Sequence, residues 1–373
     1  MKLLFWLCAS LILFTYAGYP ICLYFRARFW PRPIHRESIL PRVTMILAVH
    51  NEEKHLPGKL ANLAGLDYPG NRLETIVISD GSTDETNRIA SEWQPFGYRA
   101  VILPEHRGKA NALNRGMAEA KGEIVCFTDA RQKIASDGLK NLVANFADPS
   151  VGCASGELIL REDTKTASSD GVGLYWRLEK QIRNWEGLAG STVGTTGGFY
   201  AVRKDLLLPL PEETVLDDVY IPLQVARQGR RVVFDMTALA WDDFAPSSKQ
   251  EFRRKLRTLA GNYQLLQLAP WLLTSSNPLR LQFICHKLLR LMVPFALVGT
   301  FVSSLWLRTG AYEGALILQL MFYALAGLRF SGSKLGVLSR LSNVALTFIV
   351  LNTAAALALL YFVTGRKAAW TKG

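Results

Sequence analysis

Polar and charged side chains follow four apolar runs of the sequence, in positions where they could form a ligand site. The four groups are, in chain order, His50, Asn51, Glu52 and Glu53, then Asp80, then His106, Arg107, Gly108 and Lys109, and last Asp129, Ala130 and Arg131. A single aspartate after a strand is usually a solvated loop residue, but four such groups at one sheet edge favour a binding site. We therefore expect these side chains to form one site, of the kind that holds a nucleotide.

The elements that must position these groups alternate between β-rich apolar runs and helical patterns across residues 41–248. The expected strands are residues 43–49, 74–79, 99–103 and 123–128, and the expected helices are residues 84–93, 109–120 and 136–146. This alternation predicts an α/β domain with a mostly parallel sheet flanked by helices, in which ligands bind beyond the carboxyl ends of the strands. No G-x-G-x-x-G or G-x-x-x-x-G-K-[ST] pattern occurs, which argues against a dinucleotide oxidoreductase and a P-loop enzyme.

Composition indicates that part of the chain lies in lipid. Hydrophobic residues make up 49% of the 373 residues, and the mean hydropathy of +0.13 is high for a purely soluble protein. The net charge of +12 comes from Lys and Arg concentrated beside apolar spans, so anionic headgroups explain it better than nucleic acid, and we expect no nucleic-acid partner. The five cysteines form no C-x-x-C pair and indicate neither zinc nor disulfides.

Two apolar blocks flank the α/β region. Residues 1–27 predict an uncleaved transmembrane anchor rather than a signal peptide, and the arginines that follow place the next segment in the cytosol. Residues 249–287 read as amphipathic interfacial helices, and residues 288–365 as two or three further transmembrane helices. The basic loop 329–340 fits a cytosolic return, so the total is three or four spans. We expect an integral protein of a bacterial-type inner or plasma membrane.

Five segments resemble the motifs of one enzyme family. They are AVHNEE at 48–53, VISDGSTD at 77–84, HRGKANALN at 106–114, FTDAR at 127–131 and LDDVY at 216–220. In these the chain resembles the membrane-bound family 2 glycosyltransferases, the group that includes cellulose, hyaluronan and poly-N-acetylglucosamine synthases and ceramide glucosyltransferase. The likeness covers residues 41–264 and the flanking spans. It implies a GT-A fold inserted between transmembrane helices, and a nucleotide-sugar donor. We expect this donor to be a UDP-sugar.

The resemblance also implies roles for individual residues. Asn51, Glu52 and Asp80 belong to the motifs that hold the base and ribose of the nucleotide, and Lys109 belongs to the segment that approaches the diphosphate. LDDVY stands where the family has T-E-D, so Asp218 is the expected catalytic base, with Asp217 as a neighbour that tunes its basicity. Cap residues of a helix are the alternative reading of this acidic pair.

One motif departs from the family at the position that matters for a metal. FTDAR supplies Asp129 as the first carboxylate of the D-x-D motif, but Arg131 stands where the second belongs. Either Mg²⁺ or Mn²⁺ is still held by Asp129, phosphate oxygens and water, or Arg131 itself brings positive charge to the diphosphate. We expect a metal-assisted site with Asp129 as the metal ligand.

A second departure lies in RKLRTLAG, residues 254–261, which aligns with the family's Q-x-x-R-W-x-x-G. Arg254 takes the Gln position, Arg257 is kept, and Thr258 replaces the Trp. On a helix, Arg254, Arg257 and Gly261 share one face that could meet phosphates, although a basic interfacial helix explains the pattern as well. The lost Trp argues against processive synthesis, because the resemblance implies that this Trp stacks on the acceptor.

Together these residues predict inverting transfer of a sugar to a lipid, lipid-linked or polysaccharide acceptor at the cytosolic membrane face. Gly197 and Gly198 would line the acceptor side, with a simple hairpin as the alternative, and membrane lipids are expected partners. A processive polysaccharide synthase with coupled export is an alternative function. An inactive membrane scaffold or transport subunit on the same fold is a third, favoured by the broken D-x-D and opposed by the surviving Asp80, Asp129 and Asp218.

Overall fold

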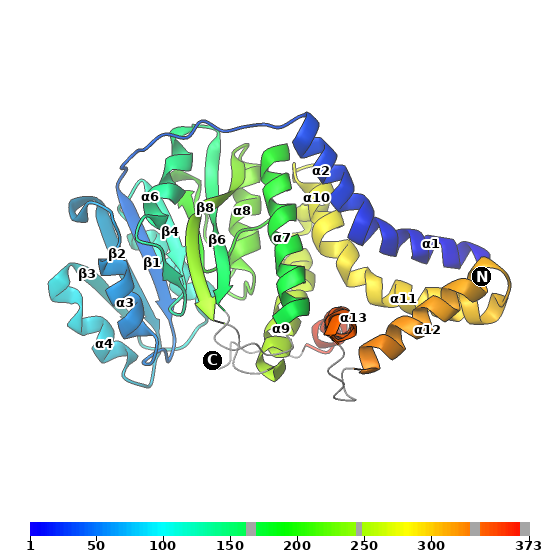
Figure 1. Ribbon diagram of the computed structural model, residues 1–373. Coiled ribbons are helices and arrows are strands. Elements are labelled where there is room, and N and C mark those ends of the chain that lie inside the picture. Colours follow the sequence, from blue (N-terminus) through cyan, green and yellow to red (C-terminus); the bar gives the residue numbers. More distant parts are fainter. Residues whose placement is uncertain (162–168, 244–247, 329–335, 366–373) are drawn as a thin grey trace.

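A computed structural model of the chain describes residues 1–161, 169–243, 248–328 and 336–365, and shows an α/β domain beside a group of long apolar helices (Figure 1). The α/β domain lies between the N-terminal helices and the C-terminal ones in sequence. Residues 329–335 of the basic loop that we expect to be cytosolic, and the last eight residues, lie outside the described part of the chain.

One eight-stranded sheet forms the centre of the domain. Its strands are β1 Val43–Val49, β2 Leu73–Asp80, β3 Tyr98–Leu103, β4 Ile124–Thr128, β5 Lys133–Ile134, β6 Val151–Arg161, β7 Phe199–Arg203 and β8 Arg231–Asp243. Their order is β3-β2-β1-β4-β7-β6-β8-β5. β3, β2, β1 and β4 run parallel, and so do β6 and β8, whereas β7 is antiparallel to both of its neighbours.

The reversed direction of β7 decides where the site can form. Because β7 pairs antiparallel with β4, its first residue, Phe199, lies opposite Thr128, the last residue of β4. The residues that precede β7 therefore reach the same sheet edge as the residues that follow β1, β2, β3 and β4. Gly197 and Gly198 come to this edge for that reason, and the Thr128 hydroxyl donates to the Gly198 carbonyl at 2.9 Å.

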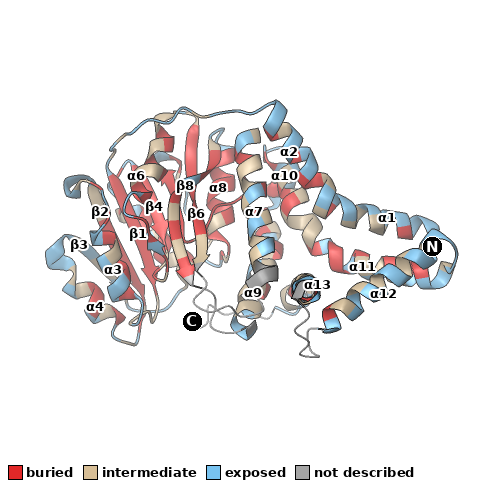
Figure 2. Cartoon of the chain, in the orientation of Figure 1, coloured by how far each residue is buried: buried red, intermediate tan, exposed pale blue. Residues whose placement is uncertain are grey.

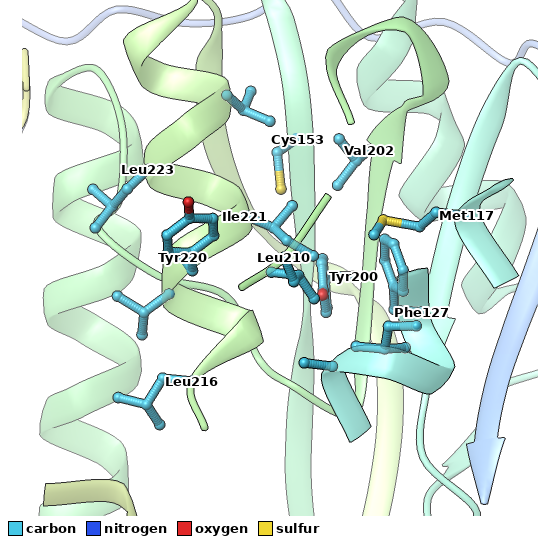
Figure 3. Close-up of a cluster of buried hydrophobic side chains, with 14 of the residues drawn as sticks. Met117, Phe127, Cys153, Tyr200, Val202, Leu210, Leu216, Tyr220, Ile221 and Leu223 are labelled. Carbon is cyan, nitrogen blue, oxygen red and sulfur yellow. The ribbon is translucent and has the colours of Figure 1, made fainter. Parts of the chain in front are cut away.

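Helices cover both faces of the sheet. They are α3 Leu56–Ala64, α4 Thr86–Glu92, α5 Lys109–Glu119, α6 Gly138–Val143, α7 Ser169–Ala189, α8 Asp217–Arg227 and α9 Ser248–Leu268. Every residue of β1 is buried, as expected for a parallel strand covered on both sides (Figure 2). On one face, Met117 of α5, Phe127 of β4, Tyr200 of β7 and Tyr220 of α8 belong to one apolar cluster (Figure 3). The Phe127 and Tyr200 rings stack at 4.8 Å between centroids.

The remaining helices form the apolar group. They are α1 Lys2–Leu13, a π-helix Phe14–Gly18, α2 Tyr19–Phe29, α10 Arg280–Phe283, a second π-helix Ile284–Leu288, α11 Leu289–Leu307, α12 Ala311–Gly327 and α13 Gly336–Val363. Within the described part of the chain, three helical stretches are long and apolar enough to cross a membrane, namely Lys2–Phe29, Arg280–Leu307 and Leu338–Val363. α12 is apolar but shorter. Figure 1 shows α1, α11 and α12 projecting together away from the sheet.

The expected mostly parallel α/β fold is confirmed, and the four expected strands agree with β1 to β4 within one residue at each end. Helix ends were predicted less well. The helix expected at 136–146 is only Gly138–Val143, followed by a 3₁₀ turn at Ala144–Ala147, and the helix expected at 84–93 begins at Thr86. Asp84 instead accepts the Thr86 and Glu53 backbone N–H groups, which ties the loop after β1 to the start of α4.

Candidate active site

Lys109 joins two acidic segments that lie far apart in the sequence. It is the first residue of α5, directly after Gly108, whose φ of 97° lies in the region that favours glycine. Its Nζ lies 3.1 Å from Asp129 Oδ1 and 3.2 Å from Asp217 Oδ1. Burial lowers the pKa of Lys109, but the two carboxylates outweigh burial and raise it above its ordinary value. Lys109 is therefore a fixed cation at the centre of the site.

Asp129 follows β4 directly and lies among basic groups. Burial raises the pKa of Asp129, but Lys109 and, more weakly, Arg131 and Arg254 hold it below its ordinary value. Beneath it, the buried Lys59 ammonium donates to Thr128 Oγ1 at 2.7 Å and to the Gln132 carbonyl at 2.8 Å. Burial lowers the pKa of Lys59 to about 7. Lys59 thus holds the β4–β5 turn that presents Asp129.

The acidic pair begins α8, where the helix N-terminus favours negative charge. Asp217 is buried and accepts a hydrogen bond from the Tyr200 hydroxyl at 3.3 Å. Asp218 is half-buried, and its backbone carbonyl accepts from the Thr195 backbone N–H at 2.8 Å and hydroxyl at 3.0 Å. Burial and the neighbouring Asp217 charge raise the pKa of Asp218 to about 6. A carboxylate with this pKa is suited to accept a proton near neutral pH.

The pH dependence of turnover is expected to report Asp218. Asp218 must be ionised to act as a base, so kcat/KM should rise with pH and reach half its maximum near pH 6. Asp217→Asn removes a negative charge that raises the pKa of Asp218, so the midpoint should move to lower pH. The exposed Glu212→Gln, five residues away, is the control and should leave the midpoint in place. If the midpoint of the kcat/KM profile is unchanged or higher in Asp217→Asn, the profile does not report Asp218.

Gly197 borders Asp218 so closely that a side chain there would touch the Asp218 carboxylate. A Cβ at position 197 would lie 3.1 Å from Asp218 Oδ2, and one at position 198 would lie 2.8 Å from the Gln132 side-chain carbon. The two glycines therefore let the segment before β7 approach the Asp218 carboxylate and the Gln132 side chain. Their place on the acceptor side stays a prediction.

Gly197→Ala is expected to displace the Asp218 carboxylate by a few tenths of an ångström and to lower kcat roughly 10- to 100-fold. The melting temperature should change little, because the displaced group is a half-buried side-chain end. Nucleotide release and thermal unfolding measure the two quantities. Gly70→Ala is the matched control, since nothing lies within 4 Å of its Cβ and it precedes β2 at the opposite sheet edge. Equal kcat in both variants would show that Gly197 has no such role.

Two arginines of α9 complete the basic side of the site. Arg254 pairs with Asp242 at 3.5 Å. Burial and the Arg254 charge lower the pKa of Arg257, while Asp129 and Asp217 act in the opposite direction, so Arg257 lies within electrostatic reach of both carboxylates. A Cβ at Gly261 would meet the Leu216 side chain at 2.7 Å, so this glycine lets α9 pack on the segment that leads into Asp217. The side of α9 that carries Arg254, Arg257 and Gly261, which we expect to meet phosphates, therefore lies toward the site.

The motifs assigned to the nucleotide form the loops beside Lys109. Asp80 is fully buried, and its carboxylate accepts the backbone N–H groups of Arg107 at 3.0 Å and Gly108 at 2.7 Å. Asn51 accepts the Thr83 N–H at 2.8 Å, and Glu52 pairs with His55 at 2.7 Å. Asp80 thus shapes the turn that carries Lys109. Direct contact of Asp80, Asn51 and Glu52 with a nucleotide stays a prediction.

Sequence reasoning missed several residues that support the site. They are Lys59, Gln132, Tyr200 and Asp242. Gln132 donates to Asp242 at 2.8 Å and so connects the β4–β5 turn with the end of β8. A lysine inside an otherwise apolar helical face, such as Lys59 in α3, is a signal that could have been noticed. Nothing local marks Tyr200 or Gln132, because their roles depend on strand order.

The fold and the site define an α/β domain of the GT-A type, with acidic and basic groups gathered at the carboxyl edge of the parallel strands. Residues 44–208 match the family described as Glycosyl transferase family 2. This chain is therefore similar to that family over residues 44–208, a little under half of its length.

Two curated relatives and one solved structure illustrate the likeness. The Probable glycosyltransferase YdaM of Bacillus subtilis (strain 168) is 25% identical over 244 residues, which are 62% of this chain and 58% of YdaM. The poly-beta-1,6-N-acetyl-D-glucosamine synthase of Staphylococcus aureus (strain COL) is 25% identical over 232 residues, 61% of this chain and 56% of the synthase. This chain thus matches a little over half the length of these relatives.

One structural neighbour is the mannosyltransferase PcManGT from Pyrobaculum calidifontis, solved in complex with GDP-Man and Mn²⁺. It superposes with a TM-score of 0.71 at 23% identity, and the match covers 98% of this chain and 100% of that one. At this identity the likeness establishes the fold, including the arrangement of the α/β domain with its apolar helices.

Proposed function

We propose that this protein is an inverting glycosyltransferase that moves a sugar from a nucleoside diphosphate to an acceptor hydroxyl at a membrane surface. The observation that carries the proposal is the meeting of Lys109, Asp129 and Asp217 beside Asp218. Fixed positive charge and a base of suitable pKa are the two requirements of such a transfer. The family of the domain and the activities named for its curated relatives support the same reaction.

The reaction needs one displacement. The acceptor oxygen forms a bond to the anomeric carbon while the bond from that carbon to the β-phosphate oxygen breaks. The acceptor proton passes to Asp218, and the nucleoside diphosphate leaves with the electron pair. Lys109, Arg254 and Arg257 stabilise the negative charge that grows on the departing diphosphate. Asp217 keeps Lys109 in place and, through its charge, keeps Asp218 basic.

Asp129 fits a divalent cation that arrives with the donor rather than one bound by the protein alone. Among the described residues, no group of three or more His, Cys, Asp or Glu side chains is placed to hold an ion. Mg²⁺ and Mn²⁺, however, are commonly held by one or two carboxylates together with substrate phosphates and water. Asp129 offers one such carboxylate. Arg131 places a positive charge at the position where the family has its second carboxylate. When bound, the ion would neutralise charge on the diphosphate.

Metal removal is expected to lower turnover without altering the fold of the protein. Because protein ligands are few, Mn²⁺ should bind weakly to the protein alone and tightly when a nucleoside diphosphate is present. Electron paramagnetic resonance of Mn²⁺ measures binding with and without the nucleoside diphosphate. Asp129→Asn should weaken the binding of Mn²⁺ only when the nucleoside diphosphate is present. Chelation with EDTA should lower kcat by roughly 100-fold or more. Full activity in EDTA would assign charge neutralisation to Lys109, Arg131 and the α9 arginines.

The location of the reaction is part of the proposal. Residues 1–27 would anchor the chain, residues 41–248 form the cytosolic catalytic domain, residues 249–287 lie at the interface, and residues 288–365 return to the membrane. Arg26 and Arg28 at the end of α2 support this orientation through the excess of positive charge expected on the cytosolic side. The acceptor is then a lipid, or a glycan presented at the inner face of a bacterial-type membrane.

Turnover with a panel of donors tests the proposal. The full chain in lipid nanodiscs is incubated with radiolabelled UDP- and GDP-sugars, and both nucleotide release and transfer of label are followed. We expect one donor, a UDP-sugar, to release its nucleotide and label a short product. A long polymer would instead indicate a processive synthase, as the name of the Staphylococcus aureus relative suggests. No release from any donor would leave an inactive scaffold as the function.

A further inference from the structure

Lys287 lies in the π-helix Ile284–Leu288, at the start of the candidate membrane span Arg280–Leu307. A single turn of π-helix inside a longer helix commonly marks a functional site, because it changes which side chains share a face. Here His286 points into a buried polar cluster with α7, whereas the Lys287 ammonium lies against the loop before β7. A Cβ on Gly194 would be 4.0 Å from Lys287 Nζ.

The acidic groups around Lys287 are already bonded to other partners. Glu179 pairs with His286 at 3.1 Å, with Arg290 at 2.6 Å and with Arg183 at 3.3 Å. Glu186 accepts from the Tyr19 hydroxyl at 2.6 Å and bonds to His286 at 2.9 Å. These contacts also join α2, α7 and the head of α11, which Figure 1 shows side by side.

Lys287 itself has no such partner. Among the described residues, no carboxylate oxygen lies within 4.0 Å of its Nζ, and no other side chain bonds to it. Its charge nevertheless reaches the catalytic side, because Lys287 and Arg183 both lower the pKa of Asp218 against the larger effects of burial and Asp217. An unpaired ammonium thus stands on the membrane side of the proposed base.

Lys255 of α9 is a second lysine within electrostatic reach of Glu179. Lys255 pairs with Glu251 at a distance of 3.7 Å and lies 5.3 Å from the centroid of the Tyr175 ring. A lysine at the start of a membrane span, such as Lys287, lies at the depth of lipid headgroups. A lysine that only reached for headgroups would point outward, whereas Lys287 points toward the loop that carries Gly197.

We propose that Lys287 binds the phosphate of the acceptor, and that the acceptor is a phospholipid whose headgroup carries a free hydroxyl beside that phosphate. The inference rests on the proposed function, and it names the acceptor class for the same site. With the phosphodiester held by Lys287, the headgroup hydroxyl reaches Asp218. Its oxygen then bonds to the anomeric carbon, its proton passes to Asp218, and the nucleoside diphosphate leaves.

Lipid binding tests the site without requiring turnover. The full chain in phosphatidylcholine nanodiscs is titrated with fluorescent phosphatidylglycerol, whose phosphate lies beside free hydroxyls, and with fluorescent diacylglycerol, which has a hydroxyl but no phosphate. Wild type should prefer phosphatidylglycerol. Lys287→Gln should weaken that binding about tenfold, because a charge-assisted hydrogen bond is lost, and Lys287→Arg should restore most of it. Lys121→Gln removes an exposed lysine at the opposite sheet edge and should bind like wild type.

Transfer to the lipid is the second readout. Label from the donor should appear on phosphatidylglycerol and not on diacylglycerol, with a KM for the lipid raised about tenfold in Lys287→Gln. Equal binding by Lys287→Gln and wild type overturns the inference, whether or not sugar is transferred. Equal affinity for inorganic phosphate and for the lipid overturns its assignment to a lipid headgroup. Selective binding without any turnover supports the phosphate site and contradicts the proposed function alone.

Discussion

Asp218→Asn is expected to lower kcat by roughly 10² to 10⁴-fold, the contribution typical of a positioned general base. Asparagine has nearly the same shape, so the start of α8 and the Thr195 contacts to the residue 218 carbonyl should persist. What is lost is the group that accepts the acceptor proton in the mechanism that we propose. Nucleotide release in the presence of acceptor measures kcat. Calorimetry measures donor affinity, which should be unchanged because Asp218 contacts the acceptor and not the donor in the mechanism that we propose.

The matched control for this variant is Asp205→Asn, which alters an exposed aspartate in the 3₁₀ turn after β7. It should retain wild-type kcat. Unimpaired turnover by Asp218→Asn would assign the base to another group, whereas equal loss of donor binding and turnover would make Asp218 a donor ligand.

Lys109→Met is expected to lower kcat/KM by roughly 10² to 10³-fold, the range seen when one preorganised stabiliser of transition-state charge is removed. The methionine leaves Asp129 and Asp217 facing each other without the ammonium that now lies about equally far from both, at 3.1 and 3.2 Å. Donor affinity should fall as well, since the diphosphate then meets two uncompensated carboxylates. Steady-state kinetics and donor binding measure these effects.

Stability needs its own control here, because removing one partner of a buried ion pair can destabilise a fold by about 3 kcal/mol. Lys109→Arg keeps the charge and should fold with a melting temperature near wild type while losing part of its kcat through altered geometry. If Lys109→Met melts like wild type and also turns over like wild type, the lysine has neither role.

The parallel half of the domain could be predicted from the sequence because its signals are local. Each of β1 to β4 is an apolar run bounded by polar groups, and in parallel strands the carboxyl ends meet at one edge. That rule alone brings the loops after β1 and β2 beside Lys109 and Asp129. The acidic pair at Asp217 and Asp218 required the family motif, since its approach to Lys109 joins segments about a hundred residues apart.

The rest of the site depends on pairings that no local pattern encodes. Gly197 reaches Asp218 only because β7 is antiparallel to both of its neighbours. The hydrophobic pattern of a strand does not predict its direction in the sheet. Lys59 was not among the expected site residues, because its role as a buried support of the β4–β5 turn follows from the packing of α3 against β4. Lys287 was expected beside the membrane boundary, and its proximity to the loop before β7 follows from the packing of α7 against the head of α11.

The stereochemistry of transfer tests the central claim most directly. The site places the Asp218 carboxylate beside a set of cations, and the mechanism that we propose for it is a single displacement without a covalent intermediate. A donor with an α-linked sugar should therefore give a product whose new bond is β, as determined by proton NMR of the purified product. An α-linked product would show retention and would contradict a single displacement directed by Asp218.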